Sequence, residues 1–168
     1  MARALMVIAP KMFRDEEYEV PRHILEASGV EVTVASTRAG TCTGKLGAVA
    51  NADVALSDAL GTPWDAVVFV GGPGASVFFD DPIAHEIARS AAVRGAVVSA
   101  ICIAPSTLAH AGLLTGRRAT AFPSQEDDLV RFGAIWTGEP VTLDGRIITA
   151  NGPEAAEEFG QALARALA

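Results

Sequence analysis

Short apolar runs alternate with amphipathic segments along most of this chain. The runs are rich in β-branched residues and have the length of buried strands, while the segments between them have helical spacing. This alternation predicts an α/β fold, a flavodoxin-like three-layer sandwich in which helices cover both faces of a mostly parallel sheet. Strands are expected at 3–9, 30–35, 64–70, 96–101, 118–121 and 146–149, and helices at 15–28, 82–94, 103–111 and 153–167.

Local signals refine this pattern. An acidic first turn suits the dipole of the helix at 15–28, Gly112 is placed to end the helix that begins at 103, and Pro153 suits the first position of the last helix. Residues 43–55 mix Gly, Thr and Val and predict a small hairpin outside the main sheet. The chain has no internal repeat or linker, which predicts a single domain over residues 1–168.

Composition limits the classes of function. Half of the 168 residues are apolar and a fifth are charged, as in globular proteins, and the net charge of -7 argues against nucleic acid or a membrane surface as a partner. The apolar run at the N-terminus is too short for a signal peptide or a membrane span. The two cysteines predict neither a disulfide framework nor a metal knuckle, so a reducing cytoplasmic location is expected.

Cys102 is the first candidate for chemistry. It ends an apolar run and directly precedes a helix-like segment, where free backbone N–H groups and the helix dipole are expected to stabilise a thiolate. A thiolate is both a nucleophile and an oxidisable group. The arrangement is related to the nucleophile elbow and predicts a strained backbone at Cys102. Cys42, in a Thr- and Gly-rich loop, is interpreted as a peripheral thiol.

Two further features are expected at the same edge of the sheet as Cys102, because ligands of open parallel sheets bind outside the carboxyl ends of the strands. Gly71 and Gly72 end another apolar strand, where the lack of side chains lets backbone N–H groups approach a substrate oxygen. The N–H groups of Gly72 and Ile103 could together form an oxyanion hole. The acidic cluster 15–17 opens the helix that follows the first strand.

These residues stand within a set of short motifs whose order and spacing resemble the ThiJ/PfpI superfamily, which includes the parkinsonism-associated deglycase and the PfpI-type intracellular proteases. The resemblance covers nearly the whole chain. It implies that Cys102 is the reactive cysteine, that the Glu17 carboxyl group hydrogen-bonds its thiol, and that the N–H groups of Gly72 and Ile103 form the oxyanion hole. It also implies a homodimer or a larger homo-oligomer, and it calls for no metal or organic cofactor. The motifs are Val70-Gly71-Gly72, Ala100–Pro105, Gly116–Thr120, Asp144–Thr149 and Asn151-Gly152-Pro153.

The chain departs from the family pattern at two positions. Ile103 follows the cysteine where PfpI-type members have a histidine, and Phe122 precedes Pro123 where the human-type members have one. Of the three histidines, His23 is nearest to the site in sequence, although it lies six residues after Glu17 and so not on the same helix face. We therefore take Gly71, Phe122 and His23 as candidate pocket residues and expect Glu17 to move the protons.

The leading functional hypothesis is a cysteine-dependent enzyme that acts on small reactive carbonyls, of the glyoxalase or deglycase kind that the resemblance implies. The first alternative is an oxidative-stress sensor or chaperone that uses reversible oxidation of Cys102. A PfpI-type cysteine hydrolase is the next alternative, weakened by Ile103, and an isocyanide hydratase also remains open. The expected ligand in each enzymatic reading is a small molecule.

Overall fold

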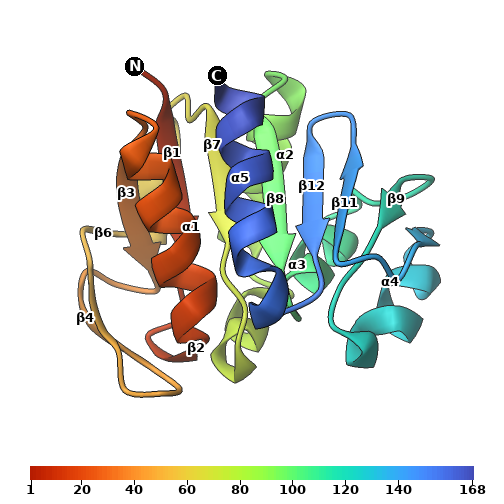
Figure 1. Cartoon of the computed structure of the whole chain (residues 1–168), viewed down its shortest axis with the longest axis horizontal. Helices are drawn as coiled ribbons and strands as arrows, with labels where there is room; N and C mark the ends of the chain where they lie inside the picture. The colour runs from red at the N-terminus through yellow and green to blue at the C-terminus, as the bar shows by residue number, and fades with distance from the viewer.

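The computed structural model describes residues 1–168 and is built on a seven-stranded sheet with the strand order β11-β12-β8-β7-β1-β3-β6 (Figure 1). All neighbouring strands are parallel except β11, which pairs antiparallel with β12. The sheet consists of β1 (Arg3–Val7), β3 (Glu31–Ser36), β6 (Val54–Ala55), β7 (Ala66–Phe69), β8 (Val97–Ile101), β11 (Val141–Asp144) and β12 (Ile147–Ala150).

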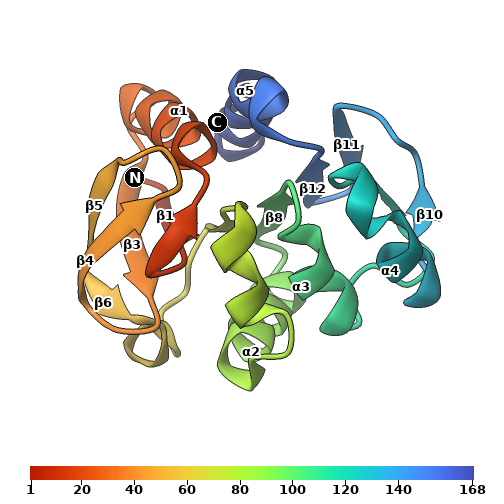
Figure 2. The ribbon, with the colours of Figure 1, turned by 90° about the horizontal axis from the view of Figure 1, so that it is seen from below.

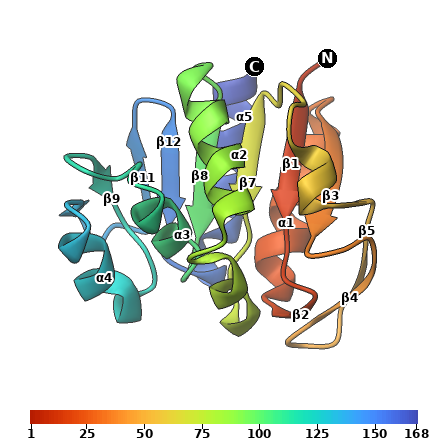
Figure 3. The ribbon, with the colours of Figure 1, turned by 180° about the vertical axis from the view of Figure 1, so that it is seen from behind.

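Helices cover both faces of this sheet. On one face α1 (Asp15–Ala27) packs against α5 (Ala156–Leu167), and on the other lie α2 (Pro82–Val93) and α3 (Pro105–His110), with α4 (Glu126–Arg131) beyond α3 (Figures 2 and 3). The three-layer α/β sandwich expected from the sequence is therefore confirmed.

The alternation of side chains along each strand divides the interior into two cores. In β1, Leu5 and Val7 belong to a cluster of 27 buried residues on the α2 and α3 face, while Ala4 and Met6 belong to a cluster of 24 on the α1 and α5 face. Because the central strands are buried on both faces, their sequences read as continuous apolar runs.

Two small sheets lie outside the main one. The strands β2 (Lys11–Phe13), β4 (Gly40–Gly44) and β5 (Val49–Ala52) form the first, so the predicted hairpin exists but begins at residue 40 rather than 43. A parallel pair, β9 (Arg118–Ala119) and β10 (Ile135–Trp136), forms the second, so the segment predicted as a strand at 118–121 is shorter than expected and does not join the main sheet.

Three local differences from the sequence prediction have physical reasons. The segment 141–144 was not predicted as a strand, because β11 is an edge strand with polar residues among its apolar ones. The helix after Cys102 begins at Pro105 instead of 103, since residues 102–104 form the turn that leaves β8. A single 3-10 turn, Pro153–Ala155, precedes α5.

The directions of the central strands show which edge of the sheet holds their carboxyl ends, where a ligand site is expected. Both chain ends lie at the amino end of the sheet, and β1, β7 and β8 all point to the opposite edge, where β2 and the start of α1 lie (Figure 1). The longest helix, α1, has 13 residues, fewer than a helix needs to cross a bilayer.

Candidate active site

The candidate residues meet at the carboxyl edge of the sheet. Cys102 follows the last residue of β8, and Gly71 and Gly72 follow β7. Glu17 comes from the first turn of α1. Together with neighbouring loops they enclose a cavity of about 220 Å³, lined by Arg14, Glu17, Lys45, Gly72, Pro73, Cys102, Ile103, Phe122, Ser124 and Pro153.

A larger hollow of about 710 Å³ lies at the opposite, amino end of the sheet. Its walls include Trp64, Arg94 and Arg146, and it contains no cysteine or other strong nucleophile. Of the two cavities, only the smaller one is lined by the candidate residues Cys102 and Glu17.

The backbone of Cys102 is strained, as its position in the turn predicts. Its φ is 64°, in the left-handed region that non-glycine residues rarely occupy. Two hydrogen bonds hold it there: the Cys102 N–H donates to the Ala150 carbonyl at 2.9 Å, and the Cys102 carbonyl accepts from the Phe122 N–H at 2.8 Å. The backbone of Cys102 is thereby fixed between the carboxyl end of β12 and the loop at Phe122.

Gly71 and Gly72 are required by close packing. A Cβ at Gly71 would contact the Glu17 carboxyl oxygen and would lie 2.5 Å from the Cβ of Cys102. Gly72 has a φ of 100°, and a Cβ there would lie 2.6 Å from the Met12 carbonyl oxygen. The two glycines thus allow α1 and the Cys102 turn to approach each other directly.

Two backbone N–H groups face the thiol. Those of Gly72 and Ile103 favour the sulfur anion and so lower the thiol pKa, and neither donates to a backbone carbonyl. Burial nevertheless raises the pKa of the Cys102 thiol to about 12, and the Glu17 carboxylate adds to that rise. The stabilised resting thiolate expected from the sequence is therefore wrong: Cys102 is 8% exposed and the helix that follows has only six residues.

Glu17 is the most unusual carboxyl group of the chain. It is completely buried, and neither of its oxygens has a hydrogen-bond partner of ordinary geometry. Burial raises its pKa from 4.5 to about 8, although the Cys102 thiol and the Arg14 guanidinium pull the other way. The group is therefore mostly protonated at neutral pH.

The three acidic residues that open α1 have different roles. Only Glu17 reaches the thiol. Glu16 pairs with Arg14 through two hydrogen bonds of 2.9 Å. The buried Asp15 carboxylate accepts the N–H groups of Leu46 and Ala48 at 2.8 and 2.7 Å, which ties the β4–β5 turn to the helix.

Two cationic side chains of the cavity were missed by sequence reasoning. Arg14 immediately precedes α1, and its N–H donates to the Gly71 carbonyl at 2.8 Å. Lys45 comes from the β4–β5 turn, and its N–H donates to the Phe13 carbonyl at 2.8 Å. No motif marks either residue, and Lys45 reaches the cavity only through the turn of the separate small sheet.

The other candidate pocket residues have mixed outcomes. Phe122 lines the cavity, whereas Gly71 does not line it but packs against Glu17 and Cys102, which do. His23 is exposed and does not line the cavity, so its proposed place there is wrong. Six residues along a helix turn the side chain by about 240°, which directs it away from the face of Glu17.

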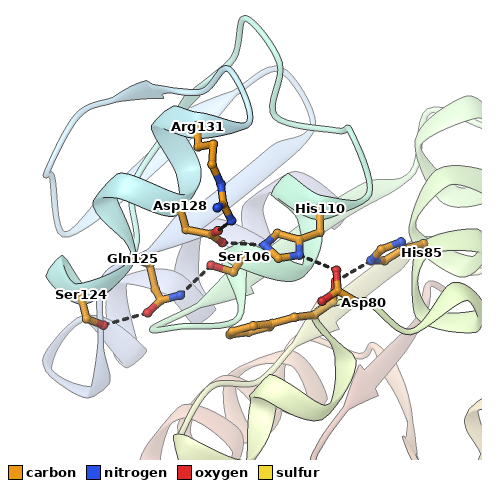
Figure 4. Close-up of polar contacts among 9 residues, drawn as sticks. Asp80, His85, Ser106, His110, Ser124, Gln125, Asp128 and Arg131 are labelled. Carbon is orange, nitrogen blue, oxygen red and sulfur yellow. Dashed lines mark hydrogen bonds and ion pairs between the residues drawn. The ribbon is translucent and has the colours of Figure 1, made fainter.

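The remaining histidines lie on the other side of the sheet, in a polar network that supports the loop behind the cavity (Figure 4). His110 bridges two carboxylates, with Nδ1 at 2.7 Å from Asp80 and Nε2 at 2.8 Å from Asp128. In the same network, the Gln125 amide donates to the Ser106 hydroxyl at 2.7 Å. Burial lowers the pKa of His110, but the two aspartates raise it more, so the net shift is upward. The His85 ring hydrogen-bonds the Phe79 carbonyl at 2.7 Å.

The second cysteine lies apart from the site. Cys42 is buried in β4 and does not line the cavity. No group of three or more His, Cys, Asp or Glu side chains is arranged to hold a metal ion.

Known proteins share this architecture over nearly the full chain. A model of the DJ-1/PfpI family matches residues 2–166. A solved ThiJ/PfpI domain protein from Brachyspira murdochii is 33% identical and superposes with a TM-score of 0.95, covering 98% of this chain and 95% of the other.

Two similar relatives have enzyme names. A deglycase of Pyrococcus abyssi is 34% identical over 149 residues, which are 89% of this chain and 90% of the relative. A glutathione-independent glyoxalase of Caenorhabditis elegans is 28% identical over 93% of this chain and 83% of its own length. With these matches and the family model, the resemblance inferred from the sequence is confirmed, and the chain belongs to the DJ-1/PfpI family.

Proposed function

We propose that this protein is a cysteine-dependent enzyme that acts on small reactive carbonyl compounds. The observation that carries the proposal is the buried, unpartnered carboxyl group of Glu17 against the Cys102 thiol, at a cavity with two free backbone donors. The names of the deglycase and glyoxalase relatives support the same class of reaction. A cavity of about 220 Å³ suits a small molecule.

The pair of Glu17 and Cys102 holds two protons at neutral pH, because both pKa values are raised. The first proton leaves with the pKa of about 8 that belongs to Glu17. The remaining proton lies mainly on the sulfur, and its transfer to the Glu17 carboxylate gives a minor form in which Cys102 is a thiolate and Glu17 is protonated. In that form the N–H groups of Gly72 and Ile103 stabilise the sulfur anion.

For a 2-oxoaldehyde such as methylglyoxal, the steps follow from this geometry. The sulfur adds to the aldehyde carbon, a C–S bond forms, and the carbonyl electron pair moves to oxygen, where Glu17 supplies a proton. The two backbone N–H groups hold that oxygen as it becomes negative. Glu17 then moves the C–H proton of the adduct to the neighbouring carbon, while the hydroxyl proton passes to the former ketone oxygen, and the product is the thioester of lactate with Cys102. Water hydrolyses the thioester to lactate and frees the thiol, so one carbon is oxidised, its neighbour is reduced, and no external oxidant is needed.

The pH dependence of lactate formation from methylglyoxal tests this scheme. We expect kcat/KM to rise about tenfold for each pH unit up to about 8 and then to level off, since the reactive pair has lost one proton. In Glu17→Gln, kcat/KM should fall at least a hundredfold, because an amide cannot shuttle protons. The variant should also lose the rise of kcat/KM with pH. A flat profile in the wild-type protein would contradict the scheme.

Reversible oxidation of Cys102 is the second candidate function. The same backbone donors that face the sulfur would stabilise a sulfinate, and a solved DJ-1 of Toxoplasma gondii, 26% identical, is in an oxidised state. The raised pKa of the thiol argues against fast oxidation at neutral pH. Intact mass after mild peroxide decides: a stable two-oxygen adduct on Cys102 without carbonyl turnover would favour the sensor.

Hydrolysis through a cysteine–histidine pair has less support. Ile103 occupies the position next to the cysteine, and no histidine lines the cavity. The family resemblance also leads us to propose a homodimer or larger homo-oligomer, which light scattering in solution would test.

A further inference from the structure

The cavity at Cys102 is lined by positive charge. Arg14 and Lys45 are its two cationic side chains, and Glu17 is its only acidic one. Because Glu17 is mostly protonated at neutral pH, it does not cancel them. This is unexpected in a chain whose net charge is -7.

Lys45 is one of only two lysines in the chain, and its ammonium group has no carboxylate within 4.0 Å. The residue is exposed, but its backbone is well fixed. The buried carboxylate of Asp15 holds the turn through two backbone N–H groups, and Gly44 packs so closely on it that a Cβ there would lie 2.6 Å from the Asp15 oxygen. The turn therefore places an unpaired cation at the cavity.

Arg14 contributes a second cation, and only part of its guanidinium group is paired with a carboxylate. Its Nε and one terminal nitrogen are bound by Glu16, while the other terminal nitrogen has no protein partner. The backbone of Arg14 is fixed to Gly71, so the guanidinium stays close to the reacting groups. Its charge acts on both Glu17 and Cys102.

In the proposed reaction the Cys102 end of the cavity binds the carbonyl group of the substrate. The cationic side of the cavity is then available to bind another part of the same molecule. A neutral dicarbonyl would leave the Lys45 ammonium without a counterpart. A carboxylate would pair with the exposed Lys45 ammonium and with the half-buried Arg14 beside it, and two such partly solvated pairs together amount to about a tenfold preference.

We propose that the site selects small carbonyl compounds that carry a negatively charged group, of which 2-oxoaldehydes with a carboxylate are the simplest class, and that Lys45 is the main specificity-determining residue with Arg14 in support. This rests on the proposed function for the reaction, but the preference for an anion follows from the cavity alone. The representative substrate is 4,5-dioxopentanoate. Addition of water would convert it to 2-hydroxyglutarate, with the aldehyde carbon oxidised and the adjacent ketone reduced.

The anion preference can be measured without any enzymatic turnover. Iodoacetate and iodoacetamide alkylate a thiol by the same displacement of iodide, but only iodoacetate is charged. We expect the rate ratio of iodoacetate to iodoacetamide at Cys102, read by mass spectrometry of its peptide, to exceed the ratio for free cysteine about tenfold. Lys45→Met should return it most of the way to the free-cysteine value.

Lys11→Met is the matched control, because it removes the same charge from the chain at an exposed residue that does not line this cavity. It should keep the wild-type ratio. A wild-type ratio equal to that of free cysteine would overturn the proposal, and so would an equal loss in the Lys11 and Lys45 variants.

Turnover supplies the second test. We expect kcat/KM for 4,5-dioxopentanoate to exceed that for its neutral methyl ester about tenfold, and this preference to fall in Lys45→Met but not in Lys11→Met. Equal values for acid and ester would refute the selectivity. Failure to convert any 2-oxoaldehyde, together with a raised alkylation ratio, would reject the proposed reaction and leave the anion site standing.

Discussion

Replacing Glu17 by Gln should make the protein more stable at alkaline pH, even though it removes the proposed proton shuttle. Glutamine has nearly the same shape as glutamate and cannot ionise. In the wild-type protein, ionisation of Glu17 must occur in a fully buried environment, where neither oxygen has an ordinary hydrogen-bond partner. The folded state therefore resists ionisation, while the unfolded state does not.

The magnitude follows from the pKa. Glu17 titrates near 4.5 when unfolded and near 8 when folded. Below pH 4.5 the group is protonated in both states and its contribution to stability is fully present. As the pH rises from 4.5 to 8 only the unfolded state loses the proton, so stability is lost, and above about 8 the loss is complete. At ~1.4 kcal/mol per pKa unit, this amounts to at most about 5 kcal/mol.

Urea unfolding at pH 5 and at pH 8.5 measures this effect. The free energy of unfolding of the wild-type protein should fall between these pH values by several kcal/mol more than that of Glu17→Gln. Glu19→Gln, an exposed change on the same helix, should follow the wild-type protein. Parallel pH curves for wild type and Glu17→Gln would refute the assignment of a raised pKa to Glu17.

Three further substitutions test other parts of the site. Gly71→Ala should lower stability by about 1–3 kcal/mol and abolish carbonyl turnover, since its Cβ would enter the space between α1 and the cysteine turn; an unchanged melting temperature would contradict the close packing. Asp15→Ala should weaken the β4–β5 turn by about 2–4 kcal/mol and speed hydrogen exchange at the amides of Leu46 and Ala48, which unaltered exchange would disprove. His110→Gln should destabilise the protein by about 1 kcal/mol at pH 6 and by less at pH 9. Its raised pKa gives a contribution that is full below the ordinary value of 6.5 and disappears as the pH rises through the folded value; an equal loss at both pH values would count against the ion pairs.

The central strands could be predicted from the sequence because they are buried on both faces and are therefore continuous apolar runs, as in β7 and β8. It failed where a strand is short or lies at an edge. Edge strand β11 carries polar residues, and β9 and β10 have two residues each, so their pairing depends on contacts that no local pattern records.

The site could be predicted in part. Cys102, Gly72 and Glu17 follow strand ends or open the first helix, so topology alone brings them to one edge. The electrostatic state of the thiol could not be predicted, because desolvation depends on how tightly the glycines let α1 approach. Lys45 was also beyond prediction, since a buried Asp15 positions its turn through hydrogen bonds over about thirty residues of sequence.

The central claim is that Cys102 is the nucleophile for small carbonyls, and lactate formation from methylglyoxal by two cysteine variants tests it most directly. The account predicts that Cys102→Ala forms no lactate above the uncatalysed rate. Cys42→Ala, which changes the thiol that does not line the cavity, should retain turnover. Lactate formation by Cys102→Ala at the wild-type rate would contradict the account.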